Sequence, residues 1–91
     1  MNTVELFTMP GCDACGPVRR LLNRVAAGLP DVVVHEVDLA EHPEVAAQHR
    51  LLACPAVAIN GTVRFVGGVS GAGEQALREL LAALQPEGAL Q

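Results

Sequence analysis

Two cysteines of this sequence, Cys12 and Cys15, have a spacing typical of redox chemistry. They follow a short strand-like segment, residues 3–8, and a Pro-Gly break, and they precede a segment with helical periodicity. The N-terminus of a helix presents unpaired N–H groups and a partial positive charge, and both favour a thiolate over a thiol. The pattern predicts that Cys12 attacks a target disulfide and that Cys15 then resolves the mixed disulfide.

Other interpretations of the same cysteines stay open. A structural zinc site usually has four ligands, so Cys54 and some of the three histidines would have to complete one. A metal or iron–sulfur binding module using Cys12, Cys15 and Cys54 is the alternative from a different functional class. A purely structural Cys12–Cys15 disulfide is a further possibility, although so short a loop adds little stability. Three cysteines are too few for the disulfide framework of a small secreted protein.

Length and composition restrict the class of protein. The 91 residues suffice for one domain, and 51% of them are hydrophobic, supplied mainly by Ala, Val and Leu. The net charge is −4, and the six basic residues are all scattered arginines, which argues against nucleic acid as a partner. No apolar run is long enough for a membrane span, and the first residues do not resemble a secretory signal. We therefore expect a cytoplasmic protein.

The elements that must position the cysteines can be read from the hydrophobic pattern. We expect strands over residues 3–8, 32–38, 56–59 and 62–66, and helices from the cysteines to about residue 28, from about 41 to 50, and around the leucines of 77–84. Asn60-Gly61 predicts a tight hairpin turn between the last two strands. The order β-α-β-α-β-β-α predicts an α/β fold with a four-stranded mixed sheet and three helices. We expect one domain over residues 1–84 and a flexible tail over 85–91.

Five local features of the sequence form one combined pattern. They are Cys12-Asp13-Ala14-Cys15, Cys54-Pro55 before a strand, the Asn60-Gly61 turn, Val66-Gly67-Gly68 before the last helix, and the strand Val34-His35-Glu36-Val37-Asp38. This pattern resembles the thioredoxin superfamily, and more closely its short, glutaredoxin-sized members, over roughly residues 3–84. The resemblance implies a thioredoxin-like fold with strand order 2-1-3-4, a cis peptide bond before Pro55, and substrate contacts from Cys54, Pro55, Gly67 and Gly68.

Several positions depart from the family pattern. The position of the buried acid of thioredoxins, six residues before the first cysteine, is Leu6, and the neighbouring Glu5 is expected on the opposite face of the sheet. Residues 1–11 contain no Lys or Arg, and the motif contains no aromatic ring, so the glutathione-binding features of glutaredoxins are missing. We therefore expect reduction of protein disulfides, with glutathione-linked glutaredoxin activity as the alternative. The negative charge of Asp13 opposes formation of a thiolate at Cys12.

Further expectations concern neighbouring residues and partners. Cys54 is expected to be a small buried apolar residue, with a redox-sensitive thiol or a metal ligand as the alternatives. Arg19 is expected on a solvated helix face, and Glu36 to be an ordinary strand residue. The expected partners are disulfide-containing proteins and an upstream dithiol reductase or glutathione, with no nucleic acid and no membrane. We expect a monomer without a cofactor and without a resident metal.

Overall fold

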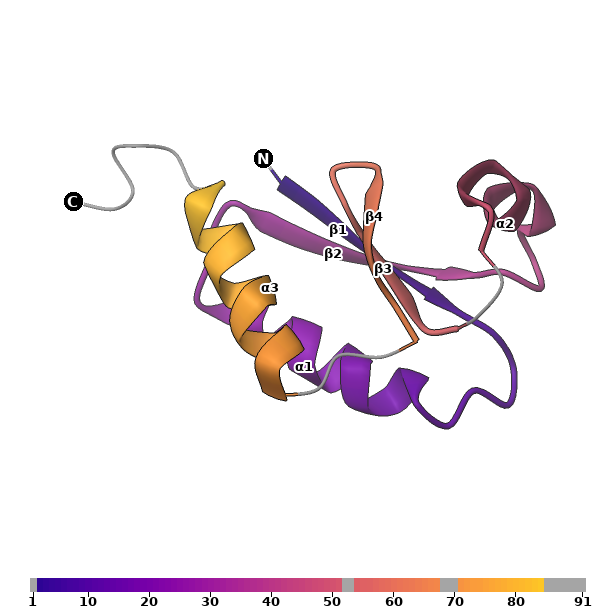
Figure 1. Cartoon of the computed structure of the whole chain (residues 1–91), viewed down its shortest axis with the longest axis horizontal. Coiled ribbons are helices and arrows are strands. Elements are labelled where there is room, and N and C mark those ends of the chain that lie inside the picture. Colours follow the sequence, from indigo (N-terminus) through magenta and orange to yellow (C-terminus); the bar gives the residue numbers. More distant parts are fainter. Residues whose placement is uncertain (1, 52–53, 68–70, 85–91) are drawn as a thin grey trace.

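Four strands form one mixed sheet in the order β2-β1-β3-β4 (Figure 1). The structure is a computed structural model, and it describes residues 2–51, 54–67 and 71–84. Along the chain the elements are β1 (Asn2–Thr8), α1 (Cys15–Ala27), β2 (Val32–Asp38), α2 (Pro43–His49), β3 (Ala56–Ile59), β4 (Thr62–Val66) and α3 (Gly71–Ala83). The predicted element order and the strand order implied by the resemblance are confirmed. The expected tail 85–91 lies outside the described residues.

The pairing of the strands follows from their connections. β1 pairs with β2 in parallel across the α1 crossover, whereas β1 with β3 and β3 with β4 are antiparallel. Between β3 and β4, Asn60 and Gly61 have φ angles of 51° and 86°. These positive values are the ones a two-residue hairpin turn requires, and Asn and Gly tolerate them. The predicted hairpin is therefore confirmed.

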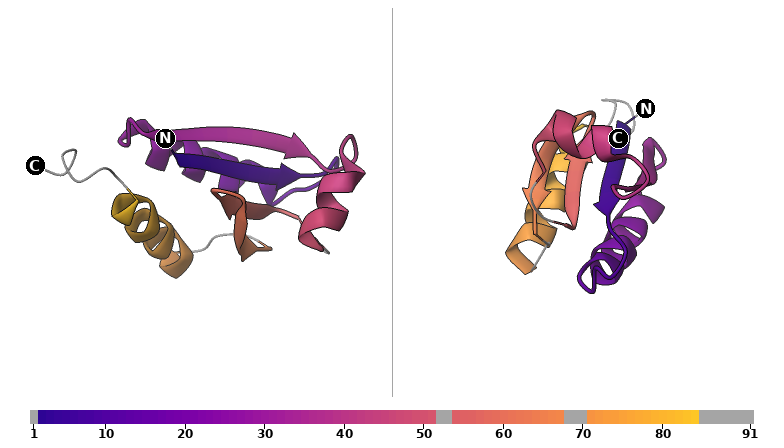
Figure 2. Two further views of the ribbon diagram at one scale, coloured as in Figure 1. Left: turned by 90° about the horizontal axis from the view of Figure 1, so that it is seen from above. Right: turned by 90° about the vertical axis from the view of Figure 1, so that its right-hand side faces the viewer.

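The helices lie on both faces of the sheet (Figure 2). α1 and α3 pack on one face, where their leucines meet the side chains of Val4 and Leu6 from β1 and of Val57 and Ile59 from β3. On the opposite face Phe7 packs with apolar residues of β3 and is flanked by side chains of α2. Successive residues of β1 thus serve different cores, because side chains alternate across a strand. β1 is the central element of the domain.

α1 owes its position to one apolar stripe. Val18, Leu21, Leu22 and Val25 recur at intervals of three and four residues, and each is 5% exposed or less. Burial of each such side chain contributes about 1.5–3 kcal/mol, so this stripe holds the helix on the sheet. Because Cys15 is the first residue of α1, the same stripe also fixes the place of the cysteine pair.

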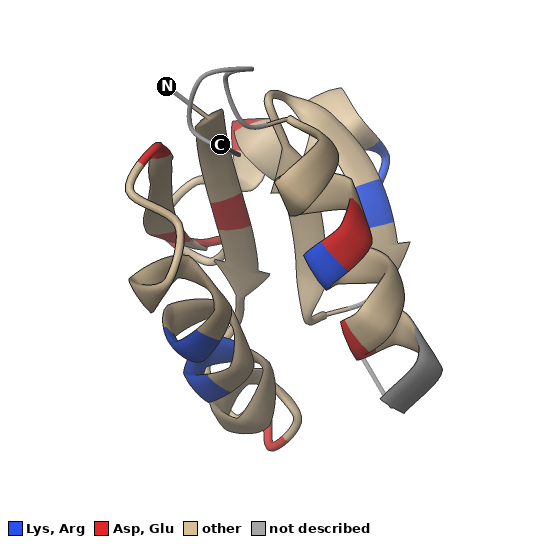
Figure 3. Cartoon of the chain, turned by 90° about the vertical axis from the view of Figure 1, so that its left-hand side faces the viewer, with Lys and Arg blue, Asp and Glu red and all other residues tan. Residues whose placement is uncertain are grey.

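Acidic and basic residues occur on both helices and strands of the described chain (Figure 3). Glu74 of α3 accepts hydrogen bonds from Arg24 of α1 at 3.3 Å and from Arg78 of its own helix at 3.0 Å. This exposed network joins the two helices that share one face of the sheet, and exposed pairs of this kind add little stability. Within the described ranges, no helix combines the length and the apolar character needed to cross a membrane.

Candidate active site

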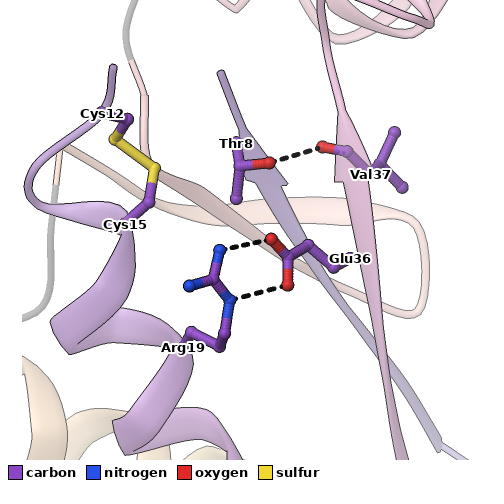
Figure 4. The surroundings of a disulfide bond; sticks show 6 residues. All are labelled: Thr8, Cys12, Cys15, Arg19, Glu36 and Val37. Carbon is purple, nitrogen blue, oxygen red and sulfur yellow. Dashed lines mark hydrogen bonds and ion pairs between the residues drawn. A yellow bond between two sulfur atoms is a disulfide. The ribbon is translucent and has the colours of Figure 1, made fainter. Parts of the chain in front are cut away.

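Cys12 and Cys15 form a disulfide where the loop after β1 leads into α1 (Figure 4). The loop is a tight one, in which the N–H of Cys12 donates to the carbonyl of Met9 at 3.2 Å. Gly11 has a φ of 80°, a value that favours glycine. Cys15 is only 3% exposed, whereas Cys12 is half-buried. The two sulfur atoms therefore differ in access, and Cys12 is the one that a partner molecule reaches more readily.

The third cysteine lies beside this pair. The Sγ atoms of Cys12, Cys15 and Cys54 all lie within 4.8 Å of one another. Cys54 is half-buried, so the expectation of a fully buried residue was wrong. Cys54 precedes β3 in the chain, and its sulfur lies beside those of Cys12 and Cys15 at the start of α1.

The peptide bond between Cys54 and Pro55 is cis, as the resemblance implied. Pro55 is almost fully buried, and its carbonyl accepts a hydrogen bond from the N–H of Gly67 at 2.7 Å. This bond ties the loop before β3 to the end of β4 and brings three of the four expected substrate-contacting residues together. The fourth, Gly68, lies outside the described residues.

An ion pair that sequence analysis had not anticipated lies next to the disulfide. Arg19 donates from Nε to Oε2 of Glu36 at 2.8 Å and from Nη2 to Oε1 at 2.5 Å (Figure 4). The hydrogen bond and the charge of Glu36 raise the pKa of Arg19. Hydrogen bonding to Arg19 lowers the pKa of the Glu36 carboxyl. Both side chains are about 40% exposed, so the pair is a surface feature of α1 and β2 and not part of the core.

The ion pair had a weak signal in the sequence. Arg19 follows Cys15 by four residues, so both side chains lie on one side of α1. Glu36 lies two residues after Val34 on β2, so both side chains point to the face of the sheet that α1 covers. The structure combines the two with the disulfide in one open cleft. The residues that line this cleft include Thr8, Met9, both cysteines, Arg19 and Glu36.

Leu6 occupies the position of the family's buried acid and is 1% exposed among apolar residues of α1 and α3. Glu5 lies on the other face, where its register partner on β3 is Ala58 of the α2-side core. The strand parity predicted from the sequence is therefore confirmed. No carboxylate of β1 lines the cleft of the cysteines, whereas Glu36 and Asp38 of the adjacent strand β2 both line it, together with Asp13 of the loop before α1.

This arrangement predicts that Glu5→Gln leaves the pH profile of disulfide reduction unchanged, because the side chain points away from both sulfur atoms. The measurement is the rate of reduction of a chromogenic disulfide between about pH 5 and 9. Glu36→Gln, on the cleft side, serves as the comparison. A displacement of the Glu5→Gln profile by a full pH unit would show that Glu5 does act on Cys15.

Proteins similar to this chain are consistent with the redox chemistry that the site indicates. Residues 2–82 match the family model of a thioredoxin domain. The chain belongs to the thioredoxin family. It is 38% identical over 65 residues to a thioredoxin from Methanocaldococcus jannaschii, covering 70% of this chain and 76% of the relative. A probable thioredoxin from Methanothermobacter thermautotrophicus is 37% identical over 68 residues, covering 74% and 80%.

The fold is also similar to that of a thioredoxin of known structure. The oxidized mitochondrial thioredoxin 3 from Saccharomyces cerevisiae superposes with a TM-score of 0.70 at 25% identity, covering 91% of this chain and 78% of that one. With the family and the Cys12–Cys15 disulfide together, this thioredoxin-family chain is a thiol–disulfide oxidoreductase. The comparisons do not favour the alternatives, a glutaredoxin linked to glutathione or a metal-binding module, as its main activity.

Proposed function

We propose that the chain reduces disulfides of other proteins by dithiol exchange, with Cys12 as nucleophile and Cys15 as resolving thiol. The observation that carries this assignment is their unequal access, since Cys15 is 3% exposed and Cys12 is half-buried. The Cys12 thiolate attacks one sulfur of the target disulfide, and the other sulfur leaves as a thiolate. The Cys15 thiolate then attacks Sγ of Cys12 and releases the second target thiolate. Two electrons and two protons have moved to the target.

The local field supports thiolate formation at this position. Cys15 is the first residue of the 13-residue helix α1, whose N-terminus carries a partial positive charge. Asp13 is exposed and opposes this effect, and the guanidinium of Arg19 is shared with Glu36. The net electrostatic stabilisation of the thiolate is therefore moderate. A strong oxidant needs a strongly stabilised reduced form, so this site suits a reductant better.

We assign the docking of the target chain to the loop before β3. The carbonyl of Pro55 accepts a hydrogen bond from the N–H of Gly67, and this bond holds the loop in place. In the described ranges no residue hydrogen-bonds to the main-chain N–H or C=O of Cys54. These two groups are the ones an extended target segment would pair with. A contact from Gly68 remains a prediction.

The upstream reductant in this proposal is a dithiol reductase. The described wall of the cleft carries one cation, Arg19, already paired with Glu36, and has no aromatic side chain to hold a glutathione molecule. We further propose that the chain acts as a monomer in the cytoplasm, without nucleic acid or membrane as partner, which its net charge of −4 and scattered arginines support.

A comparison of reductants tests this function. Insulin is the target, and the oxidised chain is supplied either with a thioredoxin reductase and NADPH or with glutathione, glutathione reductase and NADPH. We expect turnover with the dithiol system to be at least about tenfold faster. Equal or faster turnover with glutathione would instead favour glutaredoxin activity. Omission of the chain gives the background rate of each system.

The oxidised chain is predicted to keep Cys54 as a free thiol. Cys12 and Cys15 belong to one short loop, whose closure costs little entropy, so they meet more often than either meets Cys54. Alkylation of free thiols followed by peptide mass spectrometry should place the label on Cys54 in nearly all molecules. The fully reduced chain is the positive control, because all three cysteines take up the label there. A large share of that disulfide in the unmodified chain would contradict the two-cysteine mechanism.

A further inference from the structure

The three cysteine sulfurs meet at one point of the molecule although they come from two separate loops. Their Sγ atoms lie within 4.8 Å of one another, and each residue supplies one ligand atom. We propose that, once the Cys12–Cys15 disulfide is reduced, the three thiolates form a trigonal binding site for one Cu(I) ion. This capacity goes beyond disulfide reduction and does not depend on which target or reductant the chain uses.

The dimensions fit such a site. A metal–thiolate bond of about 2.3 Å places the sulfurs of a trigonal planar site about 4 Å apart. The disulfide holds Cys12 and Cys15 closer than this, so the two must separate when reduced, whereas Cys54 needs to approach by less than an ångström. Rotation about the side-chain bonds of the half-buried Cys12 and Cys54 suffices for both movements.

The ligand set selects the metal. Thiolates are soft ligands that favour Cu(I) and zinc over magnesium, calcium or manganese. Zinc in structural sites takes four ligands, and in the described part of the chain no histidine, aspartate or glutamate joins the three cysteines as a fourth. Three thiolates without a fourth protein ligand match the low coordination number of Cu(I), so the geometry favours this ion.

Burial and charge are compatible with a bound ion. Cys15 is buried and the other two cysteines are half-buried, so water is kept from part of the site. Binding forms three Cu–S bonds and releases the three thiol protons without transfer of an electron, and it leaves a net charge of −2. The N-terminus of α1 partly offsets this charge, whereas the guanidinium of Arg19 is already paired with Glu36.

Binding of the ion and the disulfide exclude one another. The Cys12–Cys15 bond consumes two of the three ligands, and a bound ion occupies the sulfur that attacks the target disulfide. Reduction of the chain therefore creates the copper site, and oxidation by a disulfide releases the ion. A chain loaded with Cu(I) is expected to be inactive as a reductant until the ion is removed.

The test uses the full chain, reduced and metal-free, titrated with Cu(I) under nitrogen against the chelator bathocuproine disulfonate. We expect one ion per chain for the reduced form and none for the disulfide form. X-ray absorption of the loaded chain should show three sulfur neighbours at about 2.3 Å. Two sulfur neighbours, or one ion shared by two chains, would overturn the three-thiolate site within one chain.

A pair of variants assigns the third ligand. Cys54→Ser removes one thiolate with little change in volume. Loss of a group that only hydrogen-bonds to a metal ligand already lowers metal affinity about 10–100-fold. Because Cys54 is itself a ligand, we expect the affinity for Cu(I) to fall at least about 100-fold. Met9→Leu is the matched control, because Met9 is an exposed residue of the same cleft and its replacement removes no thiolate, so the affinity should be unchanged. Equal affinity of Cys54→Ser and the unmodified chain would refute the proposal, while turnover of insulin reports separately on disulfide reduction.

Discussion

Replacement of Cys12 by serine is expected to lower the rate of insulin reduction by about a thousandfold or more, to the background of the reductant alone. The serine hydroxyl is not ionised near neutral pH and does not attack a disulfide sulfur, so the first step has no nucleophile. Cys15 does not take over, because it is 3% exposed under the first turn of α1. The measurement is the turnover of insulin with a thioredoxin reductase and NADPH.

The companion variant, Cys15→Ser, separates the two steps. It keeps the attacking thiolate at Cys12 and lacks the thiol that resolves the mixed disulfide, so a covalent complex with the target should accumulate and disappear on addition of dithiothreitol. Non-reducing electrophoresis detects this complex. If Cys12→Ser retained substantial turnover, or if Cys15→Ser captured no target, the assignment of nucleophile and resolving thiol would fail.

Much of the fold follows from local patterns in the sequence. The strand limits 32–38, 56–59 and 62–66 were predicted as the structure has them, because β-branched runs end at clear turn residues. α2 begins at Pro43 and not at residue 41, since proline fits the first turn of a helix and limits it on the N-terminal side. Its last residue is followed by Arg50 with a φ of 54°, which closes the helix.

Other features depend on contacts that no local pattern contains. The order of the strands and the cis bond at Pro55 came from family resemblance, since hydrophobic periodicity specifies neither. The pairing of Arg19 with Glu36 joins residues 17 positions apart on different elements, and it depends on the crossover that sets α1 over β2. The half-buried state of Cys54 likewise depends on how its loop approaches α1. The cis bond, the ion pair and Cys54 all lie at the active site, where loops from distant segments meet.

Phe7→Ala is expected to lower the free energy of unfolding by about 3–5 kcal/mol, the usual cost of removing a fully buried aromatic ring. Phe7 is 0% exposed and is the largest fully buried side chain of the described residues. Its neighbours in the core on the α2 side include Leu39 and the small side chains of Ala56 and Ala58, which cannot fill the cavity that remains. Total stability of a domain is about 5–15 kcal/mol, so this loss is large.

The effect should extend to the active site, because β1 ends at Thr8, one residue after Phe7, and leads into the loop that carries Cys12. Urea denaturation of the oxidised chain, followed by circular dichroism, measures the change as a lower midpoint with an unchanged slope. Phe65→Ala is the matched control, since Phe65 is half-buried at the edge of the other core and its loss should cost clearly less. A cost for Phe7→Ala below about 1 kcal/mol would mean that the core on the α2 side closes around the gap, and that β1 is not held in the sheet by this ring.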